Sequence, residues 1–514
     1  MNAFGIGFPA TTASRRTRRL AIALFGVCAA LPASGQDASD ERANRAWQAG
    51  AISHAQRMRA YPDVDHGAQS SPPVIQKFDA AYDPSGRIAT FQPGGDTLTS
   101  QNAFFANLGT NDRTCFTCHQ PQDGWSVSAA HVQSRFYSSF GFDPIFRLVD
   151  GATCPSDPVA TMDDKRKAYS LLMSKGLIRI GLPMPANGEF RVADLQDPYG
   201  CTSKPSTGLT SPTTGIVSIY RRPLPSTNLG FLSTIMWDGR EPSLTSQAID
   251  ATLGHAQGAA APTPAQQAQI VAFETGVFTA QIFDDKATRL DDAGASGGPV
   301  ALQKQLAGFF IGVNDPLGLN PTGAPFTSQI FDLFKTWESL HGDGDVRRAR
   351  ASVARGEQLF NNTPINIVGV DGLNDVLNKP SIAGFCGTCH DTPDVGDHSV
   401  KAPLNIGVAN AGANSPPALD ISTLPVFTLQ CMTGPLAGKV YVVTDPGRAL
   451  ITGKCADIGK LKGPILRGLA ARAPYFHNGS AATLMDVLLF YDQRFGIGFS
   501  EKDRRDLVAF LETL

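Results

Sequence analysis

The chain has 514 residues, enough for two or more domains, and its 42% hydrophobic content is enough to build substantial cores. Its formal net charge of -2 argues against nucleic acid as a partner. With 51 glycines and 36 prolines much of the chain must be loop, so we expect helices carried among long ordered connections.

The first 35 residues have the three zones of a secretory signal peptide. Residues 15–19 are basic (RRTRR), residues 20–31 are apolar, and residues 32–35 read PASG. The apolar run is too short to span a bilayer, and no later stretch is long and apolar enough to do so. The sequence therefore predicts cleavage near Gly35 and a periplasmic protein with no membrane span.

Two copies of the pattern Cys-x-x-Cys-His stand at residues 115–119 and 386–390. Cysteines three apart on one turn can both reach the vinyl edge of a porphyrin, and the histidine that follows can coordinate its iron. This is the attachment signature of a c-type haem; the alternative is a zinc or redox Cys-x-x-Cys site, which two copies in an exported chain disfavour. The predicted cofactors are two covalently bound c-type haems, held by Cys115, Cys118, His119, Cys386, Cys389 and His390.

The remaining cysteines fit an oxidising compartment. Of nine cysteines, Cys28 belongs to the predicted signal peptide and four to the haem motifs, so four remain. The simplest pairing joins Cys154 to Cys201 and Cys431 to Cys455, although four cysteines allow three connectivities. Free buried thiols are the alternative.

Segments rich in glycine, alanine or proline mark candidate seams, at residues 257–264, 291–299 and 341–344. No short repeat is evident, but the two haem segments are compatible with a distant duplication. We expect a signal peptide at 1–35, an N-terminal haem domain with insertions at 36–340 and a C-terminal cytochrome c domain at 345–514.

The C-terminal part is the easier one to predict. Residues 345–360 and 484–495 have helical spacing, and Ser500 with Asp503 resembles the capping box of a final helix. Helix, haem loop, helix and terminal helix make a cytochrome c-like domain. The expected fold is mainly α, with two cytochrome c-like haem domains carrying long loops and insertions.

Four blocks of sequence carry a family resemblance: residues 355–360 (RGEQLF), 466–469 (LRGL), 473–480 (APYFHNGS), and 237–240 (WDGR) with Gln247 after them. They resemble the bacterial di-haem cytochrome c peroxidase superfamily, which includes the maturation enzyme of tryptophan tryptophylquinone and the rubber oxygenases. The resemblance covers about half of the mature chain, in separated blocks. Its members share a scaffold, not a reaction.

The resemblance implies a division of labour between the haems. The haem on His119 would face the substrate, and the haem on His390 would store or relay an electron. Trp237 would lie between them, where its wide π system can carry a hole; otherwise it is a core anchor.

The second haem departs from the peroxidase pattern at its distal ligand. Tyr491 falls where peroxidases place a methionine, and the maturation enzyme has a tyrosine there. A phenolate stabilises oxidised iron and would lower the reduction potential. His477 is the rival ligand, and Tyr491 also lies on an apolar helix stripe, where a core tyrosine is common.

The first haem lacks the catalytic glutamate that peroxidases carry about twenty residues after the tryptophan. His255 could move the proton instead, Gln257 could hydrogen-bond a bound oxygen, or His255 is only a surface residue. His131, twelve residues past His119, matches a displaceable histidine on the distal side, or is a loop residue. The peroxidase calcium site needs an asparagine that residues 222–225 (RPLP) do not clearly supply, so calcium is compatible with the scaffold but not predicted.

These residues predict an enzyme, a periplasmic di-haem oxidoreductase that reacts with hydrogen peroxide or oxygen at its first haem. Its redox partner would be a small cytochrome or a cupredoxin. An oxygenase or protein-modifying oxidase is the alternative of the same class. An electron-transfer cytochrome with two six-coordinate irons is the alternative of another class.

Overall fold

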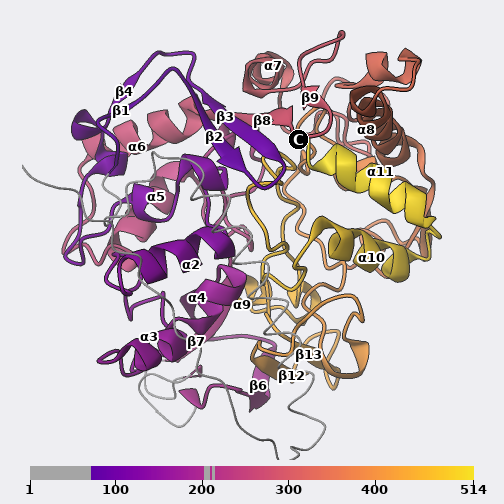
Figure 1. Ribbon diagram of the computed structural model, residues 1–514. Coiled ribbons are helices and arrows are strands. Elements are labelled where there is room, and N and C mark those ends of the chain that lie inside the picture. Colours follow the sequence, from indigo (N-terminus) through magenta and orange to yellow (C-terminus); the bar gives the residue numbers. More distant parts are fainter. Residues whose placement is uncertain (1–70, 202–208, 211–214) are drawn as a thin grey trace, which may run out of the picture. The chain divides into compact units, whose positions relative to one another are not determined.

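The computed structural model describes residues 71–201, 209–210 and 215–514 (Figure 1). The predicted signal peptide of residues 1–35 lies outside the described residues. All the described residues fall in one unit, Arg57–Leu514, which clusters by its internal contacts. The division into an N-terminal part at 36–340 and a C-terminal part at 345–514 stays a prediction.

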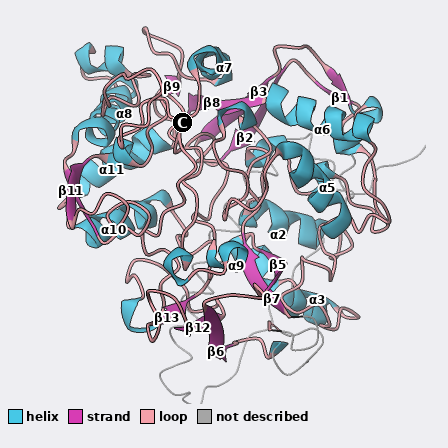
Figure 2. Cartoon of the chain, turned by 180° about the vertical axis from the view of Figure 1, so that it is seen from behind, coloured by secondary structure: helices cyan, strands magenta, loops and turns pink. Residues whose placement is uncertain are grey.

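Regular elements alternate with long loops through this unit (Figure 2). The α-helices of the described residues are α2 (Ala129–Ser138), α3 (Met162–Ala168), α4 (Ser170–Lys175), α5 (Leu244–Gly254), α6 (Pro264–Gly276), α7 (Pro299–Gln305), α8 (Asp345–Asn362), α9 (Ala449–Thr452), α10 (Leu484–Phe495) and α11 (Glu501–Leu511). The strands are β1 (Val74–Ile75), β2 (Phe78–Asp83), β3 (Gly86–Phe91), β4 (Thr97–Leu98), β5 (Ile178–Pro183), β6 (Phe190–Gln196), β7 (Ile216–Arg221), β8 (Phe278–Asp284), β9 (Thr288–Arg289), β10 (Ile365–Val368), β11 (Ser381–Gly384), β12 (Val426–Cys431) and β13 (Val440–Val443).

The strands form small antiparallel sheets. The four-stranded sheet has the order β2-β3-β8-β9, and β6 pairs with β12, which pairs with β13. Because helix makes up 30% and strand 17% of the described residues, the expectation of a mainly α fold is only partly confirmed. Many of the strands lie in the long connections before and after the haem motifs. These connections are rich in glycine and proline and lack helical periodicity, so the sequence predicted them as loops.

The helices predicted in the C-terminal part are confirmed. Helices α8 and α10 begin at the predicted residues, and Ser500 caps α11 by accepting the backbone N–H of Asp503. Helices α8 and α11 lie side by side (Figure 1), and Gly356 allows their close approach. A Cβ atom at Gly356 would lie 2.1 Å from the carbonyl oxygen of Asp506, so only glycine fits there.

Both predicted disulfides are confirmed, Cys154 with Cys201 and Cys431 with Cys455. They lie beyond the haem motifs, in the connecting segments. Each cross-link shortens the free loop of the unfolded chain and so stabilises the folded state. Among the residues that the structure describes, no helix has the length and apolar character needed to cross a membrane.

A repeat of the local structure relates two distant segments. Residues 235–255 and 475–495 begin with the same isolated antiparallel bridge, Ile235 to Glu241 in one segment and Tyr475 to Ala481 in the other. Each bridge is followed by a capping box and then by a helix, α5 in one segment and α10 in the other. The residues correspond at a constant separation of 240, so Trp237 corresponds to His477.

The two segments also hold each other by reciprocal hydrogen bonds. The backbone N–H of Arg222 donates to the carbonyl of His477 at 2.7 Å, and that of Lys462 donates to the carbonyl of Trp237 at 2.8 Å. Arg222 and Lys462 are themselves 240 residues apart. A duplicated structure whose two copies pack against each other produces such a pair of equivalent bonds. The bonds therefore support a distant duplication of the two haem segments.

Arg221 fixes this region through a fully buried ion-pair network. Its guanidinium bonds Asp238 at 2.5 Å and both carboxylate oxygens of Asp445 at 2.6 and 2.9 Å. Burial would raise the pKa of Asp445, but the charge of Arg221 outweighs it and the pKa is lowered. The network joins the end of β7 to two loops that are far apart in sequence.

Replacing Arg221 with methionine should therefore destabilise the protein strongly. Two buried carboxylates would lose their counter-charge, which costs about 3–5 kcal/mol in the free energy of unfolding. Chemical denaturation followed by circular dichroism measures this. The matched control is Arg166→Met, which removes the ion pair of two exposed side chains, Arg166 and Asp163, and should leave the unfolding midpoint unchanged. Equal midpoints for both variants would contradict the role given to Arg221.

Candidate haem sites

The two Cys-x-x-Cys-His motifs have the same local structure. Each begins with a single 3-10 turn, Cys115–Thr117 in the first and Cys386–Thr388 in the second. The backbone N–H of each histidine donates to the carbonyl of the first cysteine, at 3.0 Å for His119 and 3.1 Å for His390. One turn of chain thus presents both thiols and the imidazole together, as covalent haem attachment needs.

Each motif histidine is oriented by a backbone carbonyl six residues later. The Nδ1 of His119 donates to Trp125 at 2.9 Å, and the Nδ1 of His390 donates to Gly396 at 2.7 Å. This bond leaves Nε2 as the free nitrogen, which is the usual arrangement of a metal-ligating histidine. Burial lowers the pKa of His119 to about 4, so its ring is neutral and can coordinate iron.

The thiols of both motifs are free in the described structure, and burial raises the pKa of Cys386 and of Cys389 to about 12. None of these four sulfur atoms is in a disulfide, so all of them are available for thioether bonds. The four motif cysteines and the two histidines therefore match the predicted attachment of c-type haem.

A large cavity opens in front of each motif. The first encloses about 1530 Å³ and the second about 1580 Å³, including their open mouths. Both are lined mainly by apolar side chains, as a porphyrin site requires. Cys115, Cys118 and His119 line the first cavity, and Cys386, Cys389 and His390 line the second. A porphyrin therefore fits the residues present in both cavities.

Helices α5 and α10 present the same face to the two cavities. The first cavity is lined by Leu244, Gln247, Ala248, Ala251 and His255; the second is lined by the residues 240 positions later, Leu484, Val487, Leu488, Tyr491 and Phe495. This wall thus carries smaller and more polar side chains in the first cavity and larger, mainly apolar ones in the second. Two of the differences are Gln247 against Val487 and Ala251 against Tyr491.

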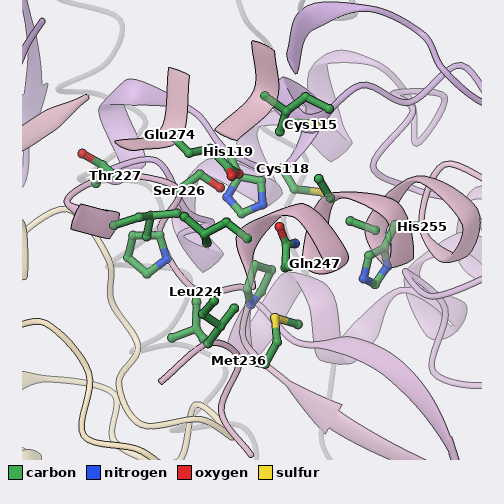
Figure 3. A pocket seen from close by; sticks show the side chains of 18 of the residues that line it. Cys115, Cys118, His119, Leu224, Ser226, Thr227, Met236, Gln247, His255 and Glu274 are labelled. Atoms are coloured by element: carbon green, nitrogen blue, oxygen red, sulfur yellow. The ribbon is translucent and has the colours of Figure 1, made fainter. Parts of the chain in front are cut away.

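Gln247 carries a free amide in the first cavity. Its side chain points from α5 toward His119 (Figure 3), and its side-chain amide makes no hydrogen bond to any residue that the structure describes. An unpaired amide in an apolar cavity is suited to bind a small polar ligand. In the sequence Gln247 stands only beside a block of family resemblance. Its correspondence to Val487, 240 residues later, is the signal that identifies it.

His255 lies at the margin of the same cavity, with 37% of its side chain exposed (Figure 3). Its Nδ1 donates to Asp150 at 2.6 Å, and Asp150 is held by Arg113 at 2.5 Å. Burial would raise the pKa of Asp150, but Arg113 and His255 outweigh it and the pKa is lowered. A carboxylate that fixes Nδ1 in this way leaves the other nitrogen free to exchange a proton.

Gln257 is not among the residues that line this cavity. Its side-chain carbonyl accepts a hydrogen bond from Asn111 at 3.3 Å. Its backbone carbonyl accepts one from Thr110 at 3.0 Å. Of the two predicted replacements for the peroxidase glutamate, the structure brings only His255 to the cavity.

Glu274 is a second cavity residue that sequence reasoning missed. It projects from α6 close to His119 and Cys115 (Figure 3) and is only 4% exposed. Burial raises its pKa to about 8, so it is mostly a neutral acid at pH 7. No motif surrounds it in the sequence, and only the packing of α6 against the haem turn reveals it.

His131 lies away from the cavity in this structure. It is 8% exposed on α2, and its Nδ1 bonds Asp123 at 2.6 Å. It does not line either cavity, so a role as a displaceable iron ligand would require α2 to move. That role stays a prediction.

Trp237 lies in the wall that the two cavities share. It lines both of them, and its indole N–H donates to the carbonyl of Arg222 at 2.8 Å. Its ring meets the ring of His477 edge to face, with the centroids 6.1 Å apart. The predicted position of Trp237 between two haem-binding regions therefore agrees with the geometry.

Both rival ligands of the second iron line the second cavity. His477 is 2% exposed, and its Nε2 lies 3.7 Å from Asp445, part of the Arg221 network. The Tyr491 hydroxyl makes no hydrogen bond within the described part of the chain, and burial raises its pKa. The Nε2 of His477 is also buried without a hydrogen-bond partner, so each of the two side chains keeps an atom free to coordinate iron.

No group of three or more His, Cys, Asp or Glu side chains suited to hold a metal ion occurs among the described residues. In the segment 222–225, where calcium was considered, the Arg222 guanidinium donates to the carbonyls of Lys175, Val127 and Arg472. The positively charged guanidinium of Arg222 thus lies where a calcium ion would need oxygen ligands, and calcium is still not predicted.

Comparisons with known proteins point to one superfamily. A RoxA-like, cytochrome c-like family model matches residues 461–495. Cytochrome-c peroxidase IdrP2 of Denitromonas iodatirespirans is 34% identical over 207 residues, which are 36% of this chain and 54% of the relative. Cytochrome c551 peroxidase of Nitrosomonas europaea is 34% identical over 99 residues, 17% of this chain and 30% of the relative.

A solved structure of a MauG-like protein associated with microbial copper homeostasis covers 57% of this chain and 73% of its own, with 17% identity and a TM-score of 0.31, too low to add to the argument. The chain spans about half the length of the first relative, IdrP2. In its cytochrome c-like segment and in the segments that match the peroxidases, the chain is similar to proteins of the di-haem cytochrome c peroxidase superfamily.

Proposed function

We propose that this chain is a periplasmic di-haem c-type oxidoreductase that reduces hydrogen peroxide in its first cavity, with electrons relayed from a haem in its second cavity through Trp237. The names of its relatives as cytochrome c peroxidases support this reading. Its electron donor would be a small cytochrome or a cupredoxin. The overall reaction takes one peroxide, two electrons and two protons to two waters.

The observation that carries the proposal is the contrast between the equivalent faces of α5 and α10. The first cavity has Ala251, Gln247 and His255 where the second has Tyr491, Val487 and Phe495. A methyl group cannot coordinate iron, so an iron on His119 would keep an open position, whereas a phenol can close the position on His390. The polar side chains of Gln247 and His255 lie beside the open position of the first iron. The apolar side chains of Val487 and Phe495 lie beside the closed position of the second iron.

Haem iron supplies the one-electron redox chemistry and a coordination position for a small oxidant. The protein would supply the rest. Gln247 would hydrogen-bond a small oxygen species that enters the cavity, and His255 would deliver a proton to it while Asp150 holds its Nδ1. His255 would then do the proton work of the missing peroxidase glutamate.

We assign the distal position of the second iron to Tyr491 rather than to His477. His477 corresponds to Trp237 in the repeat and lies in the shared wall beside Asp445. Tyr491 of α10 corresponds to Ala251 of α5, which lines the first cavity. We call α5 and α10 the distal helices, because each faces its haem motif across a cavity. The equivalence therefore supports Tyr491 over the second iron and His477 in the path between the cavities.

The haem number follows from the two motifs. The double variant Cys115→Ala/Cys118→Ala and the double variant Cys386→Ala/Cys389→Ala should each lose one of two covalent haems, because each pair holds its own porphyrin. Mass spectrometry of the intact proteins from a cytochrome-maturing host counts the adducts. A wild-type protein with fewer than two adducts would remove the basis of the proposal.

Substitutions on α5 and α10 should close the open coordination position of the first iron and open that of the second. Ala251→Tyr should place a phenol over the first iron and abolish carbon monoxide binding to the reduced protein. Tyr491→Phe should open the second iron and raise the stoichiometry from one carbon monoxide to two per chain. Absorption difference spectra measure both. His477→Ala is the matched variant and should leave the stoichiometry at one; a second binding site in that variant would give the ligand role to His477.

The proton-transfer role can be tested by turnover with a reduced cytochrome. His255→Ala should lower kcat by roughly 10²–10⁴-fold, which is the range of general acid–base catalysis. Gln257→Ala should turn over like the wild type, because its side chain bonds Asn111 outside the cavity. The opposite ranking of the two variants would assign the role to Gln257. Peroxide-independent oxidation of the donor, or none at all, would favour the oxygenase or electron-carrier alternative.

A further inference from the structure

We infer that Lys462 is a shared carboxylate-binding residue that holds a haem propionate in each of the two cavities, and that Arg467 adds a second such contact in the first cavity only. The inference rests on the proposed function in one respect, namely that both cavities hold haem. It assigns a role to two residues that neither the haem motifs nor the distal helices identify.

Lys462 is a buried cation with unused hydrogen-bonding capacity. It is 8% exposed, and its ammonium donates one hydrogen bond, to the carbonyl of Thr234 at 3.1 Å. An ammonium has three donors, and within the described part of the chain Lys462 forms no direct ion pair; the buried carboxylate of Asp397 opposes its charge only from beyond ion-pair distance. Two of its donors therefore remain available, and a buried ammonium without a direct partner at these donors favours an anion at closer range.

The position of Lys462 identifies where that anion belongs. Lys462 lines both cavities, and its backbone N–H is fixed to the carbonyl of Trp237 in the shared wall. Among the described residues that line the second cavity, it is the one lysine, and no arginine accompanies it. A haem in that cavity brings two propionates, and Lys462 is the cationic partner that its lining offers.

Haems attached at the motif cysteines would place their propionates in agreement with this position. In a c-type haem the propionates lie on the edge away from the thioether links, so they point away from the motif cysteines. In the first cavity the Arg113–Asp150 pair interacts electrostatically with Cys118 and marks the thioether end. Lys462 belongs instead to the wall toward the other cavity, where the propionate edges would meet.

Arg467 has more unused hydrogen-bond donors than Lys462 and is more deeply buried. It is 2% exposed and lines the first cavity, and both terminal guanidinium nitrogens are buried without a hydrogen-bond partner. Its Nε donates to the carbonyl of Asp394 at 2.8 Å, which anchors the side chain and leaves the two terminal nitrogens together. That fork matches the two oxygens of a carboxylate.

These contacts have an electrical consequence. A fixed positive charge near a haem disfavours its oxidised, more positive state and so raises its reduction potential. Because Lys462 faces both cavities, its neutralisation should lower both potentials. Because Arg467 lines only the first, its neutralisation should lower one. Burial lowers the pKa of Lys462, and the charge of Asp397 opposes this shift.

Redox titration of the intact holoprotein at pH 7, followed in the Soret region, tests the inference. Lys462→Met should shift both haem equilibria at least tenfold toward the oxidised form, ~59 mV for one electron. Arg467→Met should shift only the haem that binds carbon monoxide. Lys462→Arg and Arg467→Lys keep the charge and should restore values close to wild type, which a merely structural role would not predict. Lys454→Met, at an exposed lysine, is the matched control.

Unchanged potentials in Lys462→Met, or a shift of one haem alone, would overturn the shared role of Lys462. Lys462→Gln is the second neutral variant, because its amide can still donate to the Thr234 carbonyl if the methionine variant fails to fold. Resonance Raman bands of the propionates should shift in the same variants. The haem count by mass spectrometry separates this test from the proposed function: loss of haem from the wild type fails the latter, whereas two haems with unmoved potentials fail only the inference.

Discussion

The wall between the two cavities depends on a pair of reciprocal hydrogen bonds, from Arg222 to His477 and from Lys462 to Trp237. Each bond joins the segment before one repeat to the turn of the other repeat that carries Trp237 or His477. The buried Arg221, bridging Asp238 and Asp445, locks the same turns from behind. Because the backbone is held on both sides, the rings of Trp237 and His477 have a fixed geometry, 6.1 Å apart between centroids. A short and rigid connection of this kind is what electron relay between two haems would need.

On this symmetrical frame the side chains are not symmetrical. The distal helices α5 and α10 present equivalent positions to the two cavities, yet one carries Ala251 and Gln247 and the other Tyr491 and Val487. A duplicated scaffold can thus divide two tasks, small-molecule chemistry and electron storage, by exchanging few residues. We propose that the division of function in this chain arises there, while the haem-attachment turns themselves remain alike.

The sequence predicted those parts of the molecule whose signals are local. The haem motifs, the two disulfides and the helices α8, α10 and α11 depend on short spacings and capping residues, and the structure agrees with them. The small sheets were missed because pairs such as β6 and β12 join strands that are more than two hundred residues apart. Glu274 and Lys462 were missed for a related reason: their importance comes from burial beside a cavity, which no short pattern encodes. Arg467 stands in the resembling block 466–469, but that block does not show which group its side chain faces.

Electrical connection of the two haems through the shared wall is the central claim, and its most direct test is a stoichiometry. The fully reduced holoprotein is mixed rapidly, at low concentration, with one equivalent of hydrogen peroxide, and the Soret band of each haem is followed. Since one peroxide takes two electrons, the account predicts that both haems become oxidised together, and that Trp237→Phe slows oxidation of the second. Oxidation of one haem while the other stays reduced in the wild-type protein would contradict it.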